Sequence, residues 1–126
     1  MTTPRERPIN LDLTKFAFPV TAIASILHRV TGVILFVGIA FMLFALDLAL
    51  ESDAGLAEAR ALIATPIGMF VTWGLLTTLG YHVVAGIKHL IMDFGHGETL
   101  AGGRMLAQGT IVVAVILSAL AGVWVW

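Results

Sequence analysis

Three long apolar segments constrain this chain more than any other feature of its sequence. They run over residues 26–50, 64–92 and 106–126, and each is long enough for the ~20 residues with which a helix crosses the hydrocarbon core of a membrane. Because the bilayer core offers no water to backbone groups, the segments must close their hydrogen bonds internally as helices. The predicted fold is an all-α membrane protein with three transmembrane helices running up-down-up.

The composition agrees with lipid as the solvent for most of the chain. Of the 126 residues, 59% are hydrophobic and 12% are charged, whereas soluble domains carry about a quarter charged residues. The absence of cysteine excludes disulfides, thiolate iron–sulfur ligation and c-type haem attachment on this chain. A net charge of −1 and the lack of glycine-rich phosphate motifs predict no nucleic-acid partner and no phosphate-cradle enzyme.

The ends and connections predict the orientation of a single membrane-anchor domain over residues 1–126. Residues 1–15 are polar and are expected to form a cytoplasmic tail rather than a signal peptide. Residues 16–25 are expected to be an interfacial segment interrupted at Pro19. Lys and Arg gather in the tail and in the second connection, so the positive-inside rule places the N-terminus in the cytoplasm and the C-terminus outside.

A first group of polar residues lies near the start of the first segment. Ser25, His28 and Arg29 are three and four residues apart, a spacing that places them on one face of a helix together with Thr21. Ionisable residues within spans are costly and are functional candidates, and a guanidinium suits a carboxylate or a polar carbonyl. The alternative is that Arg29 extends to the interface while Ser25 bonds to its own backbone.

A second group lies near the end of the second segment. It comprises Tyr81, His82, Lys88 and His89, and two helical turns separate the two histidines. Ala85 and Gly86 lie between them on the same face, and these small residues leave room for a flat macrocycle. Imidazole is a common ligand of haem iron, so His82 is a candidate axial ligand. The alternative is a structural histidine bonded to a neighbouring helix. Under the predicted topology both groups lie at the cytoplasmic face, which predicts one shared site.

These polar positions together resemble the cytochrome b subunit of succinate dehydrogenase, most closely its proteobacterial type. The first motif is Arg7-Pro8 followed by Ser-x-x-His-Arg-x-Thr, which spans residues 25–31. The second motif comprises His82, Gly86, Ile87, Lys88, His89, Asp93 and Gly95. The resemblance extends over nearly the whole chain. One departure is Lys88, where the family commonly has Arg, and a lysine offers a single-point contact instead of a planar two-pronged one.

The resemblance implies a complex in the bacterial inner membrane, with the C-terminus in the periplasm. The implied partners are a flavoprotein subunit that oxidises succinate, an iron–sulfur subunit, and a second three-helix anchor. A haem b shared with that anchor would have His82 as one axial ligand. The residues implied near the haem and its propionates are His28, Arg29, His89, Lys88 and Gly86. The residues implied at the ubiquinone site are Ser25, Arg29, Phe18, Pro19 and Ile26.

The residues by themselves also predict an obligate hetero-oligomer, because a lone three-helix unit has little surface with which to enclose a cofactor. Two other functions compete with the redox anchor. A haem-free structural anchor would give a colourless complex. A small transporter subunit would carry ionisable residues across the whole bilayer, whereas here they gather at one face. The direction of the reaction, quinone reduction or fumarate reduction, is left open by the sequence.

Overall fold

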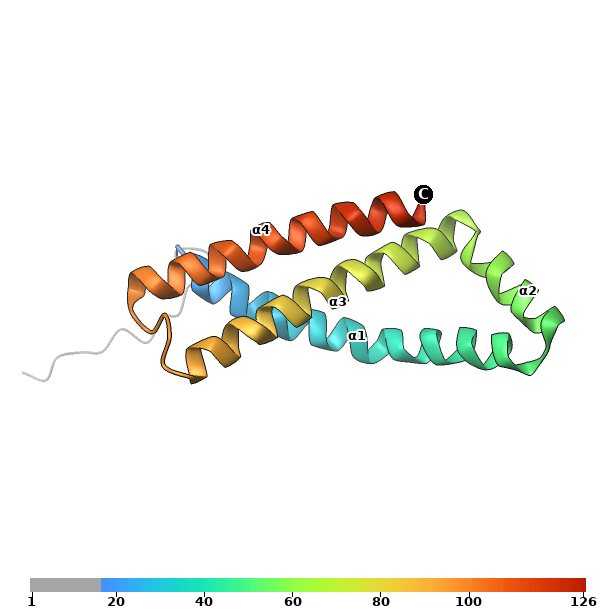
Figure 1. Ribbon diagram of the computed structural model, residues 1–126, viewed down its shortest axis with the longest axis horizontal. Coiled ribbons are helices and arrows are strands. Elements are labelled where there is room, and N and C mark those ends of the chain that lie inside the picture. The colour runs from blue at the N-terminus through green and yellow to red at the C-terminus, as the bar shows by residue number, and fades with distance from the viewer. Residues whose placement is uncertain (1–16) are drawn as a thin grey trace, which may run out of the picture.

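A computed structural model describes residues 17–126, which form four helices and contain no strand. Helix α1 comprises Val20–Glu51, α2 Asp53–Ile63, α3 Pro66–Asp93 and α4 Leu100–Val125. By length and apolar composition α1, α3 and α4 qualify as membrane spans. The start of α1 and the α3–α4 loop lie at one end of the molecule, and α2 and the C-terminus lie at the other (Figure 1). The predicted all-α fold with three spans running up-down-up is thereby confirmed.

The helix bounds differ from the predicted spans at two places. Helix α1 starts at Val20, immediately after Pro19, so residues 20–25 continue directly into the span and form no separate helix. At about 1.5 Å per residue, the 32 residues of α1 measure about 48 Å, which exceeds the ~30 Å hydrocarbon core. Helix α4 begins at Leu100, ahead of the predicted start at residue 106. The predicted tail over residues 1–15 and the Arg7-Pro8 motif lie outside the described residues.

The first connection contains a helix that the sequence analysis did not predict. Ser52 is extended and ends α1, and its hydroxyl then accepts a hydrogen bond from Gly55 N at 3.1 Å to start α2. Thr65 starts α3 in the same way by accepting from Gly68 N at 3.0 Å, and Pro66 follows it at the first helical position. Side-chain caps of this kind satisfy backbone donors that a helix start leaves free. Helix α2 therefore closes the end of the molecule opposite to the α3–α4 loop.

The three long helices are joined through small residues rather than through large ones. The buried apolar residues are Ala24, Ala59, Tyr81, Ala85, Ala107 and Ala114, and no large side chain is fully buried within the described part of the chain. On α4 the buried positions follow one stripe over Gly103, Ala107, Thr110 and Ala114. Leu, Val, Ile and Phe side chains instead cover the outside. This arrangement is typical of membrane helices, which gain little by burying leucine away from lipid and pack through small residues.

Enlarging a buried alanine is expected to destabilise the bundle. Ala107→Leu adds bulk at a residue with no exposed surface and should lower the free energy of unfolding by about 1–3 kcal/mol. Ala119→Leu, on an exposed face of the same helix, is the matched control and should have little effect. Thermal unfolding of the purified complex in detergent measures both. Equal losses in the two variants would contradict the packing described here.

Candidate functional site

Three histidines from two helices meet in the half of the molecule nearest the α3–α4 loop. The rings of His28 in α1 and His82 in α3 are stacked, with centroids 4.2 Å apart and planes inclined by 24°. The ring of His89, two turns further along α3, lies 5.1 Å from that of His28. The structure therefore brings together the histidines of the two polar groups. The spacing within each helix predicted shared faces but not this ring-to-ring contact.

Hydrogen bonds determine which nitrogen of His82 carries the proton. Its Nδ1 atom lies 3.1 Å from the backbone oxygen of His28 and 3.1 Å from Oγ1 of Thr31. A carbonyl oxygen only accepts hydrogen bonds, so Nδ1 carries the hydrogen and donates it. The Thr31 hydroxyl donates its own hydrogen to the same His28 oxygen at 2.9 Å. His82 Nε2 consequently keeps the lone pair with which an imidazole binds a metal.

Two glycines face the imidazoles of the opposite helix, and Gly32 is the one that the close approach requires. A Cβ atom on Gly32 of α1 would lie 3.2 Å from Cε1 of His82, tighter than ordinary contact. A Cβ atom on Gly86 of α3 would lie 3.7 Å from Nε2 of His28. The residue beside Gly86 in this chain is therefore His28. Ala85 has no exposed surface and lies in the packed core of the bundle.

Tyr81 and Lys88 lie on a different face of α3 from the histidines. Both are buried, and they share a helical stripe with Ala85. The Tyr81 hydroxyl donates a 2.7 Å hydrogen bond to the backbone oxygen of Ala24 and so links α3 to α1. Tyr81 belongs to the second polar group and Thr31 to the first motif, but the sequence predicts neither of their contacts. The three-residue spacing of Thr31 from His28 is the signal that points to the contact of Thr31.

The remaining candidates lie toward the outside of α1. Arg29, Phe18, Pro19 and Ile26 are exposed, and Ser25 is half-buried. These side chains are therefore open to another molecule at the start of α1. Within residues 17–126, no three His, Asp or Glu side chains are arranged so that they could together hold a metal ion.

Known proteins match this sequence along nearly its full length. The profile of the family described as succinate dehydrogenase/fumarate reductase transmembrane subunit matches residues 3–121. The succinate dehydrogenase cytochrome b556 subunit of Coxiella burnetii is 40% identical over 122 residues, covering 96% of this chain and 98% of that protein. The corresponding subunit of Paracoccus denitrificans is 32% identical over 114 residues, with 90% and 88% covered. The mitochondrial cytochrome b560 subunit of Sus scrofa is 34% identical over 112 residues, with 87% and 64% covered.

Proposed function

This chain belongs to the family of succinate dehydrogenase/fumarate reductase transmembrane subunits, and we propose that it is the cytochrome b anchor of a succinate:quinone oxidoreductase. It is a multi-pass membrane protein. The proposed complex lies in the bacterial inner membrane with the N-terminus cytoplasmic. The proposed partners are a flavoprotein subunit, an iron–sulfur subunit and a second three-helix anchor. The exposed Arg29 and Arg104, both near the end with the α3–α4 loop, support that orientation.

The observation that carries the haem proposal is the hydrogen bond from His82 Nδ1 to the His28 carbonyl. Histidines that bind metals usually donate their other ring N–H to a carbonyl or carboxylate, which fixes the tautomer and orients the ring. His82 makes this bond through Nδ1, to the His28 carbonyl. Its free Nε2 therefore fits the binding of a haem iron. When bound, haem b supplies a one-electron redox centre.

A second ligand to the haem iron would come from another subunit. Two imidazoles that both bound one haem iron would have the macrocycle between them, so their rings could not also lie face to face in contact. The rings of His28 and His82 are only 4.2 Å apart. His28 therefore cannot face His82 across a haem in this arrangement. His28 and His89 are instead proposed to line the haem edge with Gly86. Arg29 is proposed to contact a haem propionate, because its guanidinium is exposed whereas Lys88 is buried.

The proposed quinone site is the outer surface at the start of α1. Ser25 and Arg29 are one helical turn apart and offer a hydroxyl and a guanidinium to a quinone carbonyl. Phe18, Pro19 and Ile26 are exposed beside them and provide apolar walls. Reduction builds negative charge on the quinone oxygens, and fixed donors stabilise such charge as it develops. The rest of the enclosure is proposed to come from the iron–sulfur subunit and the second anchor.

Replacing His82 tests haem ligation directly. In a reduced-minus-oxidised visible spectrum of the detergent-extracted complex, His82→Ala should lose or shift the b-type signal that the wild type shows. His96→Ala, which changes an exposed histidine in the α3–α4 loop, should leave the spectrum unchanged. An intact wild-type complex without a b-type signal would favour a haem-free anchor and refute the haem proposal.

Adding one methyl group at Gly32 tests the fit around His82. Gly32→Ala places a Cβ atom 3.2 Å from His82 Cε1, so the ring must shift by a few tenths of an ångström. The haem spectrum or its midpoint potential should shift as a result. Gly74→Ala is the matched control, because nothing lies within 4 Å of a Cβ atom at that position. Identical spectra for the wild type and Gly32→Ala would contradict ligation by His82 in the observed position.

Removing the guanidinium tests the quinone site. Arg29→Ala should lower quinone reduction by about tenfold or more, the loss expected for one hydrogen bond from a charged donor. Succinate oxidation with a soluble artificial acceptor should be retained, because that reaction bypasses the membrane site. Arg104→Ala removes an exposed cation of α4 and serves as control. Parallel loss of both activities in Arg29→Ala would indicate failed assembly and remove the support for a role at the quinone.

A further inference from the structure

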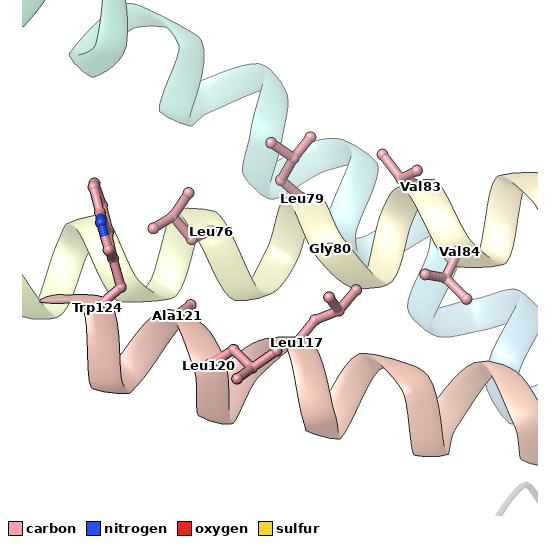
Figure 2. A pocket seen from close by; sticks show the side chains of 9 residues that line it. All are labelled: Leu76, Leu79, Gly80, Val83, Val84, Leu117, Leu120, Ala121 and Trp124. Carbon is pink, nitrogen blue, oxygen red and sulfur yellow. The ribbon is translucent and has the colours of Figure 1, made fainter.

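A groove runs between α3 and α4 on the side of the molecule away from the histidines' contact with α1. It has a volume of about 580 Å³. Leu76, Leu79 and Val83 of α3 line it together with Leu117 and Leu120 of α4 (Figure 2). Gly80 lies at the base of the groove, where a Cβ atom would lie 3.4 Å from Leu117 of α4. The lining is almost entirely aliphatic, so the groove suits a hydrocarbon chain.

Trp124 lies at one end of this groove (Figure 2). It also lines a second hollow of about 350 Å³. The two hollows follow one face of α3, since Met69 and Thr72 of the second hollow precede Leu76 of the groove by two turns and by one turn, respectively. We call the two hollows together the α3–α4 track. The residues of α3 that line the track follow one another along a single face of that helix. The lining changes from aliphatic to partly polar toward the end of the molecule that carries α2.

The polar end of the track contains a cation. Arg60 of α2 lines the second hollow with Thr72 and Trp124, and it is exposed. A guanidinium matches the geometry of a phosphate, and tryptophan commonly lies at the level of lipid headgroups. The track therefore matches the parts of a phospholipid in order. The aliphatic groove matches an acyl chain, the Trp124 indole matches the headgroup level, and the Arg60 guanidinium matches the phosphate.

We propose that the α3–α4 track binds one phospholipid, with an acyl chain along Leu76, Gly80 and Val83 and the phosphate at Arg60. From Met69 to Val83 the track measures about 21 Å at ~1.5 Å per residue, enough for the ~15 Å depth of one leaflet of a 30 Å core and the start of its headgroup region. The lipid lies in the leaflet opposite to the end with the α3–α4 loop. This site is separate from the proposed haem and quinone sites and does not depend on them.

Charge distinguishes this occupant from a partner helix. A transmembrane helix would bring apolar side chains to the groove, and it would have no need of a cation at its outer end. A phospholipid uses both ends of the track. The proposal therefore requires that Arg60 recognise the phosphate and that the groove recognise the chain, and the two requirements are separable by experiment.

The test is a titration of the delipidated, assembled complex by native mass spectrometry, with phosphatidylglycerol and with diacylglycerol of the same chains. Wild type should bind phosphatidylglycerol more tightly than diacylglycerol. Arg60→Gln should weaken phosphatidylglycerol binding by about tenfold or more and leave diacylglycerol unchanged. Gly80→Leu fills the groove and should abolish the binding of both lipids.

Matched variants control for charge and for bulk. Arg104→Gln removes an exposed cation from the start of α4, and Gly74→Leu adds the same side chain to α3 where nothing lies within 4 Å. Both should bind phosphatidylglycerol as the wild type does. If Gly80→Leu prevents assembly, the exposed Arg60→Gln still decides the question. Equal affinities of the wild type and Arg60→Gln for phosphatidylglycerol would overturn the proposal. So would a wild type that binds no lipid and loses a partner subunit when Gly80 is replaced, because a partner helix would then fill the groove.

Discussion

The close approach of α1 and α3 positions the histidines of the candidate site. Gly32 lets His82 lie against α1, and the hydrogen bond from the Tyr81 hydroxyl to the Ala24 oxygen holds the helices at that separation. Only with the two backbones this close does the His28 carbonyl reach His82 Nδ1. The small residues therefore have a second effect besides close packing. They bring a backbone acceptor of one helix within reach of a side chain of another, and that contact selects the imidazole tautomer.

The sequence predicts the spans well because one physical requirement dominates them. About twenty apolar residues in lipid have no alternative to a helix, and α3 follows the predicted segment to within two residues at each end. The apolar pattern predicts the connections and the helix ends less well than the spans. The eleven-residue helix α2 was not predicted from hydropathy. It begins at Ser52, whose side chain accepts a local hydrogen bond, and hydropathy carries no information about such a bond. Helices α1 and α4 begin earlier than predicted because helical hydrogen bonding continues beyond the apolar stretch.

For the site, the sequence predicted which residues share a helix face and which end of the bundle they occupy. It did not predict how the faces of two helices are turned toward each other. The rotation depends on glycines and alanines spread over α1, α3 and α4, whose effect on the separation of the helices is a property of the packed bundle. For that reason His28 and His82 were placed at one level but not in contact. Lys88 was grouped with the histidines, whereas its stripe on α3 is that of Tyr81 and is buried.

Helix α3 is the common member of two separate sets of interhelical hydrogen bonds. Near its middle it is tied to α1 through His82 and Tyr81. One and two turns nearer its start, α3 is tied to α4, which lies beside it in Figure 1. The Thr77 and Ser118 hydroxyls lie 2.9 Å apart, and Trp73 Nε1 donates to the Ser118 oxygen at 3.0 Å. Such bonds contribute only about 0.6 kcal/mol each on average in membranes, so their placement matters more than their number. The described part of α1 beyond Thr31 has no side-chain tie of this kind, and its exposed valines and phenylalanines are therefore available to lipid or to a second anchor without disturbing the histidines.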